Sequence, residues 1–224
     1  MTDRTPYHHG DLRNALVGAA AELAEQGGPD AVTVRAAARI AGVTPTAAYR
    51  HFSGHEDLLL AAKERSLASM ETAMRKRLAR LPDAPDPAQA AVNRLEAIGR
   101  GYVDFALSEP GLFRTAFCSD PAKQSDPQQS DPKQSGAQDF GPPGGAHGML
   151  RSGIDELLAL DFFRPDQRDG VEVAAWALVH GLSFLLLDGP FSRLPAKAKA
   201  HMLDQALDAF LSSLWNSRKS LLDG

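Results

Sequence analysis

The stretch TVRAAARIAGVTPTAAYRHF, residues 33–52, decides the fold of the N-terminal part of the chain. A threonine stands before each of two short helices, predicted over Val34–Ala41 and Pro45–Phe52, where its hydroxyl can cap the helix. Gly42 lies between them, and glycine tolerates the positive φ that a tight turn between helices needs. The spacing of caps, helices and turn glycine therefore predicts a helix-turn-helix.

Around this pair the sequence predicts a three-helix unit. A longer helix over Gly10–Gln26 places its apolar residues on one face, against which the short pair can pack. The apolar residues of the pair are Val34, Ala37, Ile40, Val43 and Ala48.

The charge of this stretch differs from the charge of the whole chain. The 224 residues carry a formal net charge of −4, so no overall basic balance indicates a nucleic-acid partner. Residues 31–55, however, contain no Asp or Glu. Their basic residues and histidines are Arg35, Arg39, Arg50, His51 and His55. A local positive surface of this kind can meet phosphate.

Three motifs carry a resemblance to a known family. They are Thr33-Val34-Arg35, Ala41-Gly42-Val43, and Tyr49-Arg50-His51-Phe52 followed by Leu58-Leu59. In this order and spacing, residues 8–62 resemble the DNA-binding domain of the TetR (tetracycline-repressor-like) transcriptional regulators. The resemblance implies an all-α homodimer. Residues 1–62 would be its helix-turn-helix DNA-binding domain, and residues 63–224 a helical bundle for effector binding and dimerisation.

The resemblance also implies which residues contact double-stranded DNA, because the second short helix is the family's recognition helix. The implied contacts are Thr33, Arg35, Thr44, Pro45, Thr46, Tyr49, Arg50, His51 and His55. We expect Tyr49 and His51 to donate to phosphate, whereas Arg50 can bind a phosphate or guanine O6 and N7. The family often has a lysine where this chain has His55. The two alanines before Tyr49 supply no hydrogen-bond code, so the operator sequence stays open.

The remaining chain also has helical periodicity, apart from one segment. Further helices are predicted over Glu56–Arg80, Ala88–Ser108, Leu112–Phe117, Gly145–Leu160, Pro165–Leu187 and Ala196–Ser217. Residues 119–136 hold three copies of Ser-Asp-Pro and almost nothing apolar, so they cannot bury enough surface to offset ordering. We therefore predict a mobile loop over residues 119–143.

The last two helices are candidates for a dimer interface. Residues 171–187 are apolar nearly all round, and such a helix is buried on most sides. Two helices from each subunit can form a four-helix interface about a two-fold axis, although both could also be ordinary core helices. The predicted interface residues are Leu178, Leu182, Leu185, Leu203, Leu207, Phe210, Leu211 and Leu214.

A candidate effector pocket involves Trp176 and His180, which lie four residues apart on one helix face. With Gly181 they resemble the Trp-His-Gly-containing C-terminal domain of a TetR subgroup. The alternative is a core histidine that packs beside a tryptophan. The predicted lining residues are Phe105, Phe113, Phe117, Trp176, His180 and Phe184.

Other classes of site find little support in the sequence. The single cysteine, Cys118, excludes an intrachain disulfide and a multi-cysteine metal site. We expect no metal, cofactor or catalytic site. The longest uncharged run, Val173–Leu187, is shorter than the roughly 20 residues that span a bilayer. A soluble cytoplasmic protein without a membrane partner is therefore expected.

The sequence thus predicts a ligand-responsive transcriptional regulator, a repressor that binds a palindromic operator as a homodimer and is released by a small molecule. Two alternatives stay open. One is an enzyme with its active site in the C-terminal helices. The other is a helical small-molecule-binding or interaction protein with weak or no DNA binding.

Overall fold

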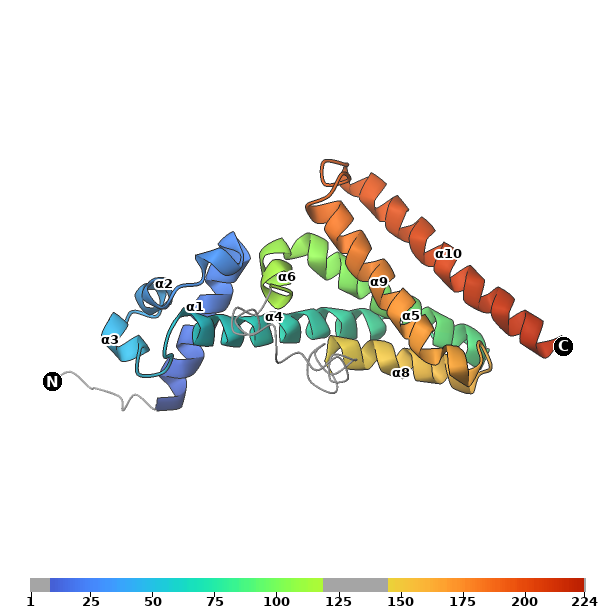
Figure 1. Cartoon of the computed structure of the whole chain (residues 1–224), viewed down its shortest axis with the longest axis horizontal. Coiled ribbons are helices and arrows are strands. Elements are labelled where there is room, and N and C mark those ends of the chain that lie inside the picture. The colour runs from blue at the N-terminus through green and yellow to red at the C-terminus, as the bar shows by residue number, and fades with distance from the viewer. Residues whose placement is uncertain (1–8, 119–144, 224) are drawn as a thin grey trace, which may run out of the picture. The chain divides into compact units, whose positions relative to one another are not determined.

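A computed structural model of the chain describes residues 9–118 and 145–223 (Figure 1). The α-helices are α1 (His9–Gly27), α2 (Val34–Ile40), α3 (Pro45–Ala48), α4 (His55–Leu78), α5 (Pro87–Ser108), α6 (Pro110–Ala116), α8 (Ala146–Ala159), α9 (Arg168–Leu187) and α10 (Ala196–Leu222). Two 3-10 turns, η1 (Pro29–Ala31) and η2 (Pro165–Gln167), precede α2 and α9. These residues contain no strand, which confirms the all-α class. The loop predicted over 119–143 lies outside the described residues.

The described residues form two compact units. The first consists of residues 9–68 and 109–118, and the second of residues 69–108 and 145–223. The first unit therefore adds α6 to the helix-turn-helix, and α4 runs unbroken from one unit into the other. The predicted division of function at residue 62 stays an expectation.

In the first unit, α1 contacts α2 and α6, and α3 packs on α2. Leu16 of α1, Ala37 of α2 and Phe52 after α3 are fully buried. On its other side α1 contacts α6. A Cβ atom placed on Gly111 of α6 would lie only 2.1 Å from the carbonyl oxygen of Ala24. No larger residue fits this approach of α6 to the last turns of α1.

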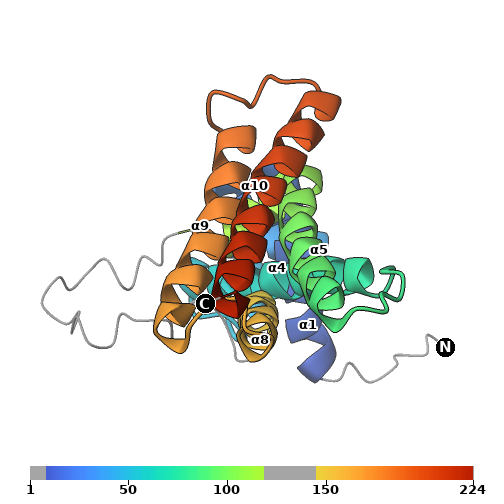
Figure 2. The ribbon, with the colours of Figure 1, turned by 90° about the vertical axis from the view of Figure 1, so that its right-hand side faces the viewer.

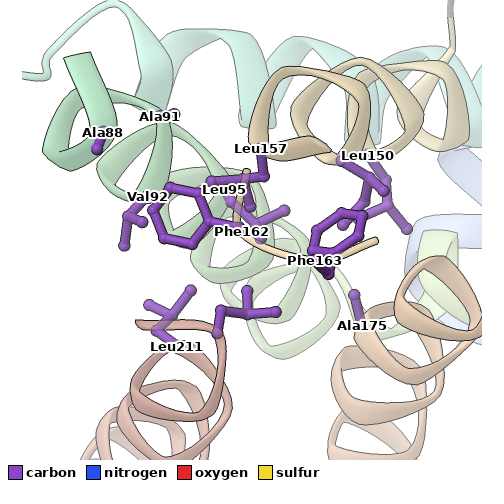
Figure 3. Packing of buried hydrophobic residues seen from close by; sticks show 12 residues of the cluster. Ala88, Ala91, Val92, Leu95, Leu150, Leu157, Phe162, Phe163, Ala175 and Leu211 are labelled. Carbon is purple, nitrogen blue, oxygen red and sulfur yellow. The ribbon is translucent and has the colours of Figure 1, made fainter. Parts of the chain in front are cut away.

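The second unit is built around α5, which contacts α8, α9 and α10. Figure 2 shows α9 and α10 as a helical hairpin beside α5. Figure 3 shows the apolar core that these four helices share with the turn after α8. Its members are Ala88, Ala91, Val92, Leu95, Leu150, Ile154, Leu157, Phe162, Phe163, Ala175, Leu211 and Leu214.

Two helix ends differ clearly from the prediction. The second short helix was predicted to reach Phe52, but α3 ends at Ala48 and continues as a tighter turn. In this turn the N–H of Arg50 donates to the carbonyl of Ala47, three residues back, at 3.3 Å. The last helix runs past its predicted end at Ser217 to Leu222, and in this extension Arg218 donates from Nε to the carbonyl of Leu160 at 2.9 Å.

One stretch of the described residues, Pro165–Leu187, has the length and hydropathy of a membrane-crossing helix. A core helix of a soluble protein passes the same test. Here α9 packs against α5, α8 and α10, and its Glu172 is buried beside charged partners.

Candidate DNA-binding site

The predicted helix-turn-helix forms with the expected local chemistry. The Oγ1 atom of Thr33 accepts from the N–H of Ala36 at 3.2 Å, and Thr44 caps α3 in the same way through Ala47, also at 3.2 Å. Gly42 adopts φ +69° in the turn, a backbone conformation that residues other than glycine rarely take. The sequence therefore fixes the angle at which α3 leaves α2.

Nearly all of the residues implied to contact DNA lie on the surface. His51 is half-buried, and the others are exposed. The exposed ones are Thr33, Arg35, Thr44, Pro45, Thr46, Tyr49, Arg50 and His55. Ala48 and Phe52 of the same segment are fully buried and hold it against the rest of the unit. The surface is thus free to meet a partner while its base is fixed.

The hydroxyls of Thr33 and Thr44 can still act as hydrogen-bond donors while they cap their helices. Each Oγ1 accepts one helix N–H, so its own O–H can still donate to a phosphate oxygen. This is the kind of contact that sets the register of a protein on DNA without reading its sequence.

The electrostatics of this surface are locally positive. Arg35, Arg39 and Arg50 are all exposed, and no acid occurs in residues 31–55. The carboxylate of Asp57, further on, accepts from the backbone N–H of Ser53 at 2.9 Å at the start of α4. Its charge is therefore engaged at a helix N-terminus, where an anion is favoured.

Sequence reasoning missed one arginine beside this surface. The guanidinium of Arg13, an exposed residue of α1, lies 5.1 Å from the ring centre of Phe52. A cation over an aromatic face is attracted to it, so Arg13 is held next to the turn that carries Tyr49 and Arg50. Nothing in the local pattern around Arg13 signals this, because the contact joins residues far apart in the sequence.

The predicted dimer residues lie mostly inside the protomer. Leu182, Leu203, Leu207, Leu211 and Leu214 are buried, Leu178 and Phe210 are half-buried, and Leu185 is exposed. The helical spacing that identified them marks the face turned toward the protomer's own core. The large apolar side chains of α9 with the greatest exposure are instead Val173, Phe184 and Leu185, at 63%, 41% and 42%.

The predicted effector residues fall into both units. Phe113 and Phe117 belong to the first unit, where their ring centres lie 5.0 Å apart. Phe105 belongs to the second unit and is buried. The second unit also brings together Trp176, His180 and Phe184 in a row along α9, with neighbouring ring centres 5.3 and 5.1 Å apart.

The sequence analysis did not identify Tyr102, which completes this row from α5. The Tyr102 hydroxyl lies 2.6 Å from Nδ1 of His180. Burial lowers the pKa of His180 and so favours the neutral ring, whose tautomer sets the direction of this hydrogen bond. Burial also raises the pKa of Tyr102 far above its ordinary value, against a hydrogen bond from Trp176 that lowers it. His180 is therefore a hydrogen-bonded histidine beside a tryptophan.

A buried ion-pair cluster continues this row at the other end of α9. Glu172 is 7% exposed, and its carboxylate lies 2.6 Å from Arg168 Nη1 and 2.9 Å from His147 Nε2. His147, from α8, lies edge-on to Trp176 at 6.3 Å. The spacing of Arg168 and Glu172, four residues apart, was a signal for their pairing. The described residues include no group of three His, Cys, Asp or Glu side chains placed to hold a metal ion.

A helix-turn-helix with an exposed second helix and a positive surface defines a DNA-binding transcriptional regulator. Residues 16–62 match the family model for "Bacterial regulatory proteins, tetR family". Residues 95–210, just over half of the chain, match the model for "Tetracyclin repressor-like, C-terminal domain". The chain therefore belongs to the TetR family. Its placement in the Trp-His-Gly subgroup stays a prediction.

Solved structures show the same fold. A protein of unknown function from Rhodococcus sp. RHA1 has a TM-score of 0.65 at 24% identity, covering 95% of this chain and 98% of that one. A TetR variant from Acinetobacter baumannii AYE, in complex with minocycline, has a TM-score of 0.55 at 19% identity, with 95% and 98% covered. A tetR-family transcriptional regulator from Streptomyces coelicolor has a TM-score of 0.58 at 20% identity, with 96% and 85% covered. No curated protein matches the chain.

Proposed function

We propose that the protein is a repressor that binds a palindromic operator as a homodimer and leaves it when a small molecule binds. The observation that carries this proposal is the exposed face of α3 and the turn after it, which presents Thr46, Tyr49 and Arg50 in an acid-free surface on a buried base. In a dimer, two such helices would enter successive major grooves, about 34–36 Å apart. A ligand that favours another spacing would shift the population away from DNA.

The outer face of α9 supports the homodimer. Val173, Phe184 and Leu185 are exposed there, and Ala177 and Gly181 between them are small enough for a close approach of a second helix. Exposed apolar residues gathered on one helix face mark an interaction site. A second copy of α9 would cover this face about a two-fold axis.

The row of aromatic and polar side chains on α9 supports a small-molecule effector. Trp176, His180 and Phe184 offer apolar ring surface, and Tyr102 and His180 add hydrogen-bonding groups beside it. Binding sites for small molecules combine these two features. In this proposal the protein acts in the cytoplasm on double-stranded DNA and a small molecule, without a metal, cofactor or membrane and without chemical turnover.

The proposal is tested by measuring the affinity of the full chain for duplexes tiled across the DNA that flanks its own gene. We expect one duplex to bind in preference to the others, and Tyr49→Phe and Arg50→Ala each to weaken binding. Loss of one phosphate contact should lower the salt slope of log K by about 0.9. Arg193→Ala, at an exposed position of the second unit, is the matched control and should bind like the original chain.

Three outcomes would contradict the proposal. If no duplex binds preferentially, the protein is a binding or interaction module without a DNA partner at this locus. If neither variant at positions 49 and 50 changes affinity or salt dependence, the surface is misassigned. Turnover of a bound small molecule would indicate an enzyme.

A further inference from the structure

The geometry of α3 and of the tighter turn that follows it divides the exposed residues there into a ridge and two flanks. Successive residues of a helix are rotated by about 100° about its axis. Ala48 is fully buried and marks the inward direction. Thr46, two residues before Ala48 in α3, is rotated by about 160° from it, and Arg50, two residues after it in the tighter turn, by about 120–160°, so the two form the outermost ridge. Both are exposed.

The residues between the ridge and the core lie on the flanks. Pro45 and Tyr49 lie on one side of the ridge, at about 60–100° from Ala48, and Ala47 lies on the other side. When a helix enters the major groove, its outermost ridge faces the base edges and its flanks face the sugar-phosphate walls. Tyr49 is therefore placed to donate to phosphate on one wall.

The two ridge residues carry different recognition chemistry. Arg50 is exposed, and its planar fork of donors matches guanine O6 and N7. Thr46 offers a methyl group and a hydroxyl. The neighbouring Thr44 differs, because its hydroxyl oxygen already caps α3.

We propose that Thr46 and Arg50 are the specificity-determining pair, and that each operator half-site contains a guanine read by Arg50 close to a thymine read by Thr46. Four residues of helix rise by about 6 Å, which corresponds to about two base pairs. The thymine C5-methyl contacts the Thr46 methyl, and the guanine accepts two hydrogen bonds from Arg50. This inference rests on the proposed function and assigns base reading to two of the residues on that surface.

The first test selects binding duplexes from a pool with a randomised central region, using the full chain. We expect the enriched sequences to share, in each half-site, a G·C pair within about two base pairs of an A·T pair. Selection with Arg50→Ala should lose the preference at the G·C position alone, and selection with Thr46→Ser should lose it at the A·T position alone. Tyr49→Phe should bind more weakly and keep the same preferred sequence.

The second test changes single atoms of the selected duplex. Replacing the guanine by 7-deazaguanine removes N7. This should lower the affinity of the original chain for the duplex about tenfold and leave the affinity of Arg50→Ala unchanged. Replacing the thymine by uracil removes the methyl group. This should lower the affinity of the original chain for the duplex about fourfold and leave the affinity of Thr46→Ser unchanged.

The outcomes separate this inference from the proposed function. If no sequence is enriched, the proposed function fails together with the inference. If sequences are enriched but Arg50→Ala weakens every duplex equally and lowers the salt slope by about 0.9, Arg50 binds phosphate and the inference is overturned. If the change from thymine to uracil lowers the affinity of Thr46→Ser as much as that of the original chain, the assignment of Thr46 is overturned.

Discussion

At the residue scale, the Tyr102 hydroxyl is a buried link between α5 and α9. It forms a hydrogen bond with Nδ1 of His180, at an O–N distance of 2.6 Å. We expect Tyr102→Phe to lower the free energy of unfolding by about 1–3 kcal/mol, because the His180 ring nitrogen loses its hydrogen-bond partner. Urea unfolding followed by circular dichroism measures this change.

Tyr49→Phe is the matched control, because it removes the same hydroxyl from a side chain that is 48% exposed. It should leave the unfolding free energy unchanged within about 0.5 kcal/mol, while it weakens DNA binding. If the two variants lose equal stability, the Tyr102–His180 hydrogen bond contributes nothing specific to the fold.

The same pair predicts how stability depends on pH. Burial holds the pKa of His180 below its ordinary value of about 6.5. As pH falls through 6.5, the unfolded chain takes up this proton before the folded chain does, so the folded state loses stability. The free energy of unfolding that depends on neutral His180 is therefore fully present above about pH 6.5. It is lost progressively as the pH falls below about 6.5, until the folded-state pKa is reached.

Unfolding free energies measured between pH 5 and pH 8 test this expectation. In His180→Gln, the unfolding free energy should fall less between neutral and acid pH than in the original chain. The same substitution at exposed His201 should leave this fall unchanged. An unchanged pH profile in His180→Gln would show that another group causes the fall.

At the scale of elements, the contact between α1 and α6 requires a glycine, which has no side chain, at position 111. Gly111→Ala would place a Cβ atom 2.1 Å from the carbonyl oxygen of Ala24 and 2.5 Å from that of Glu25. These are backbone atoms that cannot rotate away, so we expect a loss of at least about 2 kcal/mol of stability. Thermal unfolding measures it.

Gly18→Ala provides the opposite expectation in the same unit. A Cβ atom at this exposed position of α1 meets nothing within 4 Å. Alanine favours a helix over glycine by about 1 kcal/mol, so this variant should melt at a higher temperature than the original chain. If Gly111→Ala also raised the melting temperature, α6 would not pack on α1 as described.

The sequence was most informative where structure depends on neighbouring residues. Thr33, Gly42 and Thr44 act on backbone groups within a few positions of themselves, so their roles could be predicted from the local pattern. The recognition helix was predicted too long, because its last turn tightens at Arg50 through bonds that the pattern does not distinguish from α-helical ones.

Contacts between distant residues escaped prediction. Tyr102 and His180 are 78 positions apart, and the side chain of Glu172 meets His147 from another helix. Leu207 and Leu211 illustrate a different difficulty. Their spacing identifies an apolar face, but the same spacing serves the protomer core and a dimer interface, and here both residues are buried in the core.

At the scale of the whole molecule, we predict a dimer that depends on the outer face of α9. Leu185→Glu would place a charge on this face, where covering it without a partner charge costs several kcal/mol. The original chain should sediment as a dimer at micromolar concentration, and Leu185→Glu as a folded monomer. Leu185 is 42% exposed in the protomer, so the fold itself should tolerate the change.

Two further variants locate the interface. Gln205→Glu adds a charge to an exposed polar position of α10 and should remain dimeric. Leu207→Glu buries a charge inside the protomer and should unfold it, in contrast to Leu185→Glu. A monomeric original chain, or a dimeric Leu185→Glu, would show that this face is not the interface.

The composition of the first unit from two separate segments limits how the protein can be recombined with its relatives. Residues 109–118 complete a unit whose other part ends near residue 68. A chimera joined at residue 62 would therefore set a foreign α1 against the native α6. Gly111 tolerates only a backbone that follows the path of Ala24 and Glu25. Exchanging the DNA-binding part between family members requires that α6 be exchanged with it.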